Sequence, residues 1–230
     1  MVTQIYSVIS VEEAVACTEV GADNIGMLVA DEGENYPCTI EVSTAIDIMK
    51  ALENKALRIL IPGTNYRENA IKFCATVKPD VLHLSNAIKS SKEFLTDLRK
   101  VQPNVKIMQA IGVYDESSIE EAIVLSEFSD YLLLDTYVPN PIGSIGAIGA
   151  THDWNISRKI VESVSIPVIL AGGLGPDNVA DAIRKVRPYG VDSLTKTSIK
   201  NNDGVLIGKD IEKVKLFCEI ARKVGEEEGL

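Results

Sequence analysis

The chain has 230 residues, of which 46% are apolar, and this is enough for one domain with a sizeable core. Its 33 acidic residues outnumber its 23 basic ones, which gives a formal net charge of −10. Most of the surface therefore repels polyanions, and this argues against nucleic acid as a partner. No run approaches the roughly 20 apolar residues of a membrane span, and no basic segment precedes an apolar run near the N-terminus. We therefore expect a cytoplasmic protein with no membrane partner.

The cysteines are scattered along the chain, at Cys17, Cys38, Cys74 and Cys218. No two of them have the Cys-x-x-Cys spacing, so neither a disulfide framework nor a zinc site is indicated. His, Asp and Glu residues also lack the spacing of metal ligands. We expect packed thiols in a reducing compartment and no bound metal.

Short apolar runs alternate with segments of helical period along the whole chain. The apolar runs predict strands at residues 3–8, 24–29, 57–61, 81–84, 106–111, 131–135, 167–171 and 191–194. The other segments predict helices at residues 10–20, 44–54, 65–76, 90–101, 117–128, 155–164, 176–186 and 210–225. Many of the runs are apolar throughout, which is typical of parallel strands buried on both faces. This order predicts an α/β fold, a (β/α)₈ TIM barrel forming a single domain over residues 1–230, with a doubly wound open sheet as the alternative.

Helix-start signals agree with this order. Ser10 precedes Glu13 by three residues, the spacing of a capping box, and Pro176 is expected in the first turn of its helix. Two connections are long, at residues 30–40 and 136–154, and both follow predicted strands. Barrels keep their chemistry in loops of this kind.

The last two predicted strands indicate a phosphate site. Gly172 and Gly173 end one strand, and without a Cβ their backbone N–H groups are able to approach an anion closely. Ser193, Thr195 and Lys196 end the next strand and offer hydroxyl groups and an ammonium. We therefore expect a phosphorylated small molecule as the ligand.

Polar side chains at other strand ends are candidates for proton transfer or substrate contact. Asp135 ends an apolar strand, so burial should raise its pKa and suit it to be a general acid. His83 and Gln109 are placed on polar strand faces that are expected to point into the barrel. Tyr6 either contacts the ligand or fills the barrel mouth, because an unperturbed phenol is a poor base.

Residues of the loop at 136–154 indicate a function less clearly than those at the strand ends. Gly146 and Gly149 are candidate substrate contacts there, and the glycines give the loop either the mobility of a lid or simple turns. His152 is interpreted as a turn residue at a helix start.

Several segments together resemble the phosphoribosylanthranilate isomerase family over nearly the full length. They are residues 4–8 (Gln-Ile-Tyr-Ser-Val), 21–26 (Gly-Ala-Asp-Asn-Ile-Gly), 133–136 (Leu-Leu-Asp-Thr), 146–149 (Gly-Ala-Ile-Gly), 152–154 (His-Asp-Trp), 171–174 (Ala-Gly-Gly-Leu), 187–192 (Arg-Pro-Tyr-Gly-Val-Asp) and 208–210 (Gly-Lys-Asp).

The resemblance implies an Amadori rearrangement of an N-substituted ribose phosphate, without metal or organic cofactor, in tryptophan biosynthesis. A general acid protonates the ring oxygen, the ring opens to an iminium, and a general base removes the C2 proton. The family's acid corresponds to Asp135. Its base is a cysteine in a Lys-Ile-Cys-Gly segment, where this chain has Gln4, Ile5, Tyr6 and Ser7. An arginine that holds the anthranilate ring is replaced here by Asn35.

We therefore expect an isomerase of the aldose–ketose type, with Asp135 as acid and Tyr6 or His83 as candidate bases. Loss of the thiol leaves open a barrel that binds a phosphorylated ligand without isomerase activity. A third possibility is a lyase or epimerase acting on a sugar phosphate. Either a monomer or a homodimer is compatible with the sequence.

Overall fold

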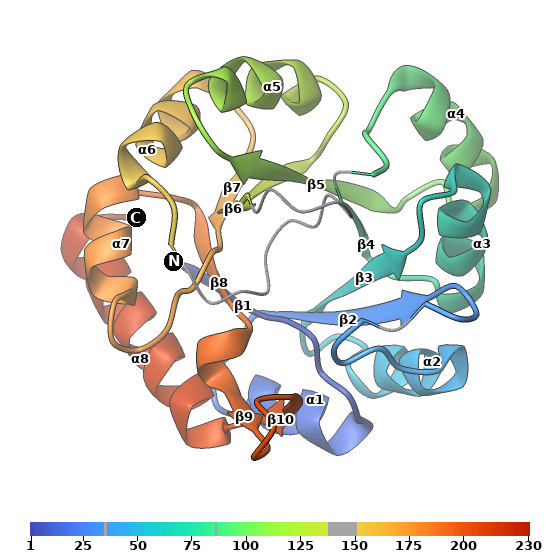
Figure 1. Cartoon of the computed structure of the whole chain (residues 1–230), viewed down its shortest axis with the longest axis horizontal. Coiled ribbons are helices and arrows are strands. Elements are labelled where there is room, and N and C mark those ends of the chain that lie inside the picture. The colour runs from blue at the N-terminus through green and yellow to red at the C-terminus, as the bar shows by residue number, and fades with distance from the viewer. Residues whose placement is uncertain (35, 86, 138–150) are drawn as a thin grey trace.

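Eight parallel strands close into a barrel in the computed structural model, which describes residues 1–34, 36–85, 87–137 and 151–230 (Figure 1). The strands are β1 (Val2–Ile5), β2 (Asn24–Ala30), β3 (Leu57–Gly63), β4 (Val81–Leu84), β5 (Lys106–Val113), β6 (Tyr131–Thr136), β7 (Val168–Leu170) and β8 (Gly190–Ser193). Each strand pairs with its neighbours in chain order, and β1 pairs with β8 to close the ring. The predicted (β/α)₈ barrel is confirmed, and the alternative of an open sheet is wrong.

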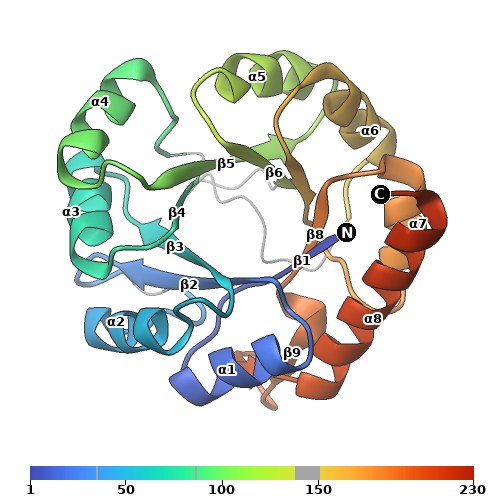
Figure 2. The ribbon, with the colours of Figure 1, turned by 180° about the vertical axis from the view of Figure 1, so that it is seen from behind.

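Helices surround the barrel in chain order, as both views show (Figures 1 and 2). They are α1 (Val11–Glu19), α2 (Val42–Ala51), α3 (Arg67–Val77), α4 (Lys92–Val101), α5 (Ser117–Ser126), α6 (Trp154–Ser163), α7 (Val179–Val186) and α8 (Ile211–Glu228). Each bound lies within three residues of the predicted one. Pro176 was expected in the first turn of its helix, but it lies in the turn before α7, which begins at Val179.

Three short elements after β8 were not predicted. They are a 3₁₀ helix, η1 (Thr195–Thr197), and the antiparallel strands β9 (Ser198–Lys200) and β10 (Leu206–Lys209). The two strands lie outside the barrel beside α1 (Figure 1). Their apolar side chains Ile199 and Ile207 are exposed, so no buried face produces a pattern readable from the sequence.

Side-chain hydrogen bonds cap the N-terminus of α1 and hold the connection between β1 and α1. The Ser10 hydroxyl accepts a hydrogen bond from Glu13 N at 3.2 Å, as the capping-box spacing predicts. The Glu13 carboxylate accepts from Ile9 N at 2.7 Å, which satisfies a second donor before α1.

Alternation along the strands divides the apolar residues into an outer and an inner core. The outer core lies between the sheet and the helices and includes Ile5 and Phe94. The inner core fills the barrel with Tyr6, Ile59, Val81, Met108, Leu133, Ile169 and Ala171. All strands being parallel, their carboxyl ends meet at one rim, where the candidate site residues gather.

Three of the four cysteines are packed thiols, as expected, whereas Cys38 is half-buried. Cys17, Cys74 and Cys218 are free and buried, and burial raises the pKa of the Cys17 and Cys74 thiols to about 12. Among the described residues, no helix has the length and apolar character needed to cross a membrane.

Candidate active site

The turn after β7 passes close to the end of β6. Gly172 and Gly173 adopt φ values of +88° and +60°, a region that favours glycine. A Cβ atom on Gly172 would lie 2.6 Å from Thr136 Oγ1 and 3.0 Å from His152 Nδ1. Only glycine fits between these side chains, and the approach of the Gly172 N–H group to an anion stays a prediction.

Main-chain donors collect where this turn meets η1. Within the described parts of the chain, no acceptor pairs with the N–H groups of Gly172, Gly173 or Thr195. The Asn178 side chain closes the turn, since Nδ2 donates to Gly173 O at 3.0 Å and Oδ1 accepts from Gly175 N at 2.9 Å. Donors held in this way without an acceptor form a concavity suited to an anion.

Ser193 connects the turn after β7 with η1 and does not face a ligand. Its hydroxyl donates to Leu174 O at 2.7 Å and accepts from Thr197 Oγ1 at 3.2 Å. The side chain is buried, and both bonds are to the protein. The expectation that Ser193 binds phosphate is therefore corrected: Ser193 holds the turn after β7 against the end of β8.

Two lysines lie near η1 in different settings. Lys196 forms an ion pair with Asp177 at 2.7 Å near the surface. Lys209, which the sequence did not single out, is buried and donates to Ser198 Oγ at 2.8 Å. Burial lowers the pKa of Lys209. Both ammonium groups add positive charge near η1.

Asp135 stands at the carboxyl end of β6, as expected from the sequence. One carboxylate oxygen accepts from Thr136 N at 2.7 Å. Burial of the carboxyl group raises its pKa to about 6, and the bond from Thr136 N opposes this shift. A carboxyl group with this pKa is able to donate a proton near neutrality.

His152 lies in the turn before α6, as interpreted from the sequence, and its ring also contacts the framework of the site. Its Nε2 lies 2.7 Å from Ser157 Oγ, and its Nδ1 lies 3.3 Å from Thr136 Oγ1. Burial lowers the pKa of His152 to about 4, so the ring is neutral at pH 7. The ring thus connects the start of α6 with the end of β6.

Tyr6 and His83 meet inside the barrel mouth. Tyr6 Oη lies 2.5 Å from His83 Nδ1, and the ring centroids are 5.3 Å apart. The Tyr6 ring packs on Gly26, where a Cβ would lie 1.9 Å from ring carbons. Burial lowers the pKa of His83 to about 4 and raises that of Tyr6 well above its ordinary value, with Asp192 and Asp135 adding to the rise. Both groups are therefore neutral at pH 7, and the phenol donates to Nδ1 in the tautomer whose ring proton is on Nε2.

A chain of buried polar groups continues below Tyr6. Gln4 Nε2 donates to Asp192 Oδ1 at 3.3 Å, and Gln4 Oε1 accepts from Asn24 Nδ2 at 3.1 Å. Burial, together with the charge of Asp135, raises the pKa of Asp192 well above its ordinary value. Burial thus disfavours the charged form of Asp192, and the hydrogen bond from Gln4 and the charge of Lys209 oppose this shift.

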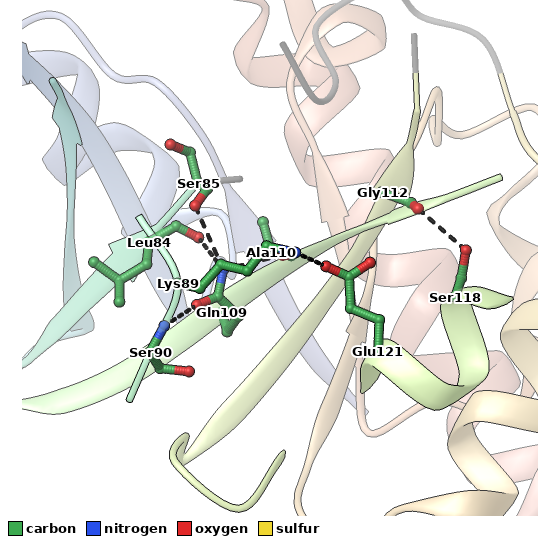
Figure 3. Close-up of polar contacts among 9 residues, drawn as sticks. All are labelled: Leu84, Ser85, Lys89, Ser90, Gln109, Ala110, Gly112, Ser118 and Glu121. Carbon is green, nitrogen blue, oxygen red and sulfur yellow. Dashed lines mark hydrogen bonds and ion pairs between the residues drawn. The ribbon is translucent and has the colours of Figure 1, made fainter. Parts of the chain in front are cut away.

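Gln109 does not line the mouth. It follows the inward-facing Met108 on β5, and both ends of its side-chain amide form hydrogen bonds with the main chain (Figure 3). Its Oε1 accepts from Ser90 N at 2.8 Å, and its Nε2 donates to Leu84 O at 3.3 Å. The expectation of substrate contact is corrected: the strand's alternation turns Gln109 outward, where it holds the connection between β4 and α4.

The remaining candidates, Gly146 and Gly149, lie outside the described residues, as does Asn35. No group of three His, Cys, Asp or Glu side chains in the described ranges could hold a metal ion.

Comparison with known proteins connects this barrel to one family. The family described as N-(5'-phosphoribosyl)anthranilate (PRA) isomerase matches residues 80–220. The N-(5'-phosphoribosyl)anthranilate isomerase of Methanocella arvoryzae is 33% identical over 211 residues, which cover 92% of this chain and 93% of that protein. The chain belongs to the PRA isomerase family.

Further relatives agree with this membership. N-(5'-phosphoribosyl)anthranilate isomerase 2 of Methanosarcina mazei is 35% identical over 214 residues, covering 92% of this chain and 90% of that protein. The crystal structure of the phosphoribosyl anthranilate isomerase from Thermotoga maritima has a TM-score of 0.77 at 25% identity, covering 97% of this chain and all of that one. The resemblance identified from the sequence motifs is confirmed.

Against the PRA isomerase pattern, the barrel mouth is altered where β1 ends. Tyr6 stands where the family resemblance places a cysteine, and its larger side chain fits because Gly26 offers no Cβ. At the candidate phosphate site the donors are main-chain N–H groups, so a change of side chain alters that part of the site less. At the end of β1 the departure thus falls on the part of the site that handles protons.

Proposed function

We propose that this chain isomerises N-(5'-phosphoribosyl)anthranilate to the corresponding 1-amino-1-deoxyketose phosphate, a step of tryptophan biosynthesis, without a cofactor. Family membership supports the reaction. The observation that carries the proposal is Asp135, a carboxyl group with a raised pKa at the end of β6, beside the turn that presents free main-chain donors.

The phosphate group binds at the turn after β7 and at η1. The N–H groups of Gly173 and Thr195 donate to its oxygens, with Gly172 allowing the turn to pass close to β6. Lys196 is available once it leaves Asp177, an exchange that costs little because exposed ion pairs are weak. This end positions the ribose so that its reacting carbons lie in the barrel mouth.

Asp135 is the general acid. In its protonated form it donates to the ring oxygen of the ribose, and the ring opens to the iminium. With a pKa of about 6, roughly one tenth of the molecules carry this proton at pH 7. Neutral His152 and the neighbouring Thr136 support the end of β6 without adding a competing charge.

One observation favours a second function. Tyr6 replaces the thiol that the family uses as base, and an isolated buried phenol is a weaker base still. A barrel with the phosphate end intact and no base would bind the sugar phosphate and leave it unchanged. Turnover separates the two functions.

The test compares the wild type with Asp135→Asn, using conversion of N-(5'-phosphoribosyl)anthranilate followed through the absorbance of its anthranilate group. We expect turnover by the wild type and a loss of about 10²–10⁴-fold in kcat for Asp135→Asn. Asp47→Asn is the matched control, since Asp47 is an exposed aspartate on α2 and its removal should leave turnover unchanged. A wild type that binds phosphate and does not turn over the substrate would support the second function instead.

A further inference from the structure

In the mouth of the barrel, the side chains of Tyr6 and His83 are in hydrogen-bond contact without a bound substrate. Tyr6 comes from the end of β1 and His83 from β4, and their side chains meet across the interior with 2.5 Å between Oη and Nδ1. Both are almost fully buried, at 4% and 7% exposure. The only further polar contact of the phenol among the described residues is Met108 Sδ at 3.7 Å.

Neither group is suited to remove a proton alone. Desolvation and two nearby carboxyl groups, Asp135 and Asp192, oppose a free phenolate at Tyr6. His83 is a neutral imidazole, but its Nδ1 is covered by the Tyr6 hydroxyl. Joined by one hydrogen bond, however, the phenol oxygen accepts a proton as its own proton passes to Nδ1, so no free phenolate forms.

The other titratable groups of the described mouth are committed elsewhere. Asp135 is the acid of the proposed function. Both ring nitrogens of His152 lie within hydrogen-bond distance of hydroxyl groups. Asp192 lies below Tyr6 and is bonded to Gln4. The pair of Tyr6 and His83 is left as the base.

We propose that Tyr6 and His83 act together as the group that removes the C2 proton of the ring-opened substrate and later returns it, with Tyr6 Oη as the contact and His83 Nδ1 as the proton store. This inference rests on the proposed function and assigns the base that it lacks.

The proton and electron transfers balance. The C2–H bond breaks, its electron pair forms the C1=C2 bond, and the iminium π pair moves to nitrogen. The C2 proton goes to Tyr6 Oη while the phenol proton goes to His83 Nδ1, which leaves an imidazolium. In the second half His83 returns a proton through Tyr6 to C1. The C2 hydroxyl proton goes to the Asp135 carboxylate, which replaces the proton given to the ring oxygen.

Two substitutions separate this chemical role from packing. Tyr6→Phe keeps the ring against Gly26 and removes only the hydroxyl. His83→Asn keeps an acceptor near the position of Nδ1 and removes the capacity to hold a proton. Tyr131→Phe is the matched control, because this phenol belongs to the amino end of β6 and its oxygen accepts only from Lys106 within the described residues.

For each variant, kcat, KM, exchange of the C2 proton with deuterated solvent, and the thermal shift caused by inorganic phosphate are measured. We expect Tyr6→Phe and His83→Asn to lose about 10²–10⁴-fold in kcat and in exchange rate. Their KM and phosphate response should stay within about threefold of the wild type, because positioning by the phosphate end is untouched. Tyr131→Phe should match the wild type in all four quantities.

A kcat within threefold of the wild type in either variant would overturn the inference and leave the proposed function standing. Absence of turnover in the wild type itself would overturn both. If KM rises and the phosphate response is lost while kcat falls, the pair holds the barrel mouth in shape and does not transfer the proton, which also overturns the inference.

Discussion

Replacing Gly172 and Gly33 by alanine, one at a time, tests how closely the turn after β7 packs against β6. Both have a φ of +88°, so Gly→Ala places a side chain in the same unfavourable backbone region at either position. At Gly33, no atom of the described residues lies within 4 Å of the added Cβ. At Gly172, the added Cβ would lie 2.6 Å from Thr136 Oγ1, 3.0 Å from His152 Nδ1 and 3.3 Å from Asp135 Oδ1. The difference between the two variants isolates the close approach.

The expected free energies follow from these distances. A left-handed alanine costs about 1–2 kcal/mol, and the stiffer unfolded chain returns about 0.4–1 kcal/mol, so Gly33→Ala should lose about 1 kcal/mol. Overpacking adds about 1–3 kcal/mol at Gly172, which brings that variant to about 2–4 kcal/mol. Urea unfolding measures both values.

Activity gives a second, independent result for the same pair. The added methyl group at Gly172 pushes on the Asp135 carboxylate and on the donors at Gly173, so kcat/KM should fall and inorganic phosphate should bind more weakly. Gly33→Ala should leave both unchanged. Equal stability losses in the two variants, or full activity of Gly172→Ala, would refute the close packing of this turn against β6.

Three other substitutions test the electrostatics. Because the pKa of Asp135 is raised to about 6 in the folded protein, the unfolded chain loses this proton at lower pH, and stability falls as pH rises from about 4 to about 6. Asp135→Asn should remove that fall and be more stable than the wild type at pH 8 by up to about 3 kcal/mol in urea unfolding. No gain in stability would contradict the raised pKa. Asp80→Asn should cost about 1–3 kcal/mol in the same assay, because it removes the negative charge and one of the two oxygens that accept from Arg58 at 2.7 and 2.6 Å, while an unchanged midpoint would mean that the pair contributes nothing. Lys209→Met should keep stability within about 1 kcal/mol, since Lys209 lacks a carboxylate partner among the described residues, yet weaken phosphate binding at least threefold in a thermal-shift titration. Unchanged phosphate binding would show that this charge does not act on the site.

The barrel and its carboxyl rim could be predicted from the sequence because their signals are local. Apolar runs of strand length alternate with helical periods, and Asp135 ends such a run, so its place at the rim follows from strand direction. Gly172 and Gly173 follow another run and carry the positive φ values that glycine allows. Each of these predictions needed only neighbours along the chain.

The errors arise where tertiary contacts decide. Gln109 was assigned to the mouth on polarity alone, although alternation with Met108 turns it outward to Ser90. Ser193 lies at the end of β8, as a phosphate ligand would, but its hydroxyl donates to the main-chain oxygen of Leu174, which is distant along the chain. Spacing in the sequence does not predict this contact. Lys209 is buried by a hairpin whose exposed strands have no amphipathic pattern.

The pairing of Tyr6 with His83 lies between these cases. His83 was a candidate because its strand face was expected to point inward, and Tyr6 because it occupies the position of the family's cysteine; the two side chains meet inside the barrel. Their contact depends on the curvature of the barrel and on Gly26, which leaves space for the phenol ring. Period and composition predict the faces of strands, whereas distances across a barrel need the closed structure.

Whether this barrel is a phosphate-anchored isomerase is decided by comparing two substrates on the wild-type protein, N-(5'-phosphoribosyl)anthranilate and the same molecule without its phosphate. We expect turnover of the phosphorylated compound with a kcat/KM at least about 10³-fold higher, since the main-chain donors at Gly173 and Thr195 hold a dianion and their binding energy positions the ribose for Asp135. Equal kcat/KM values for the two compounds, or turnover of neither, would contradict this function.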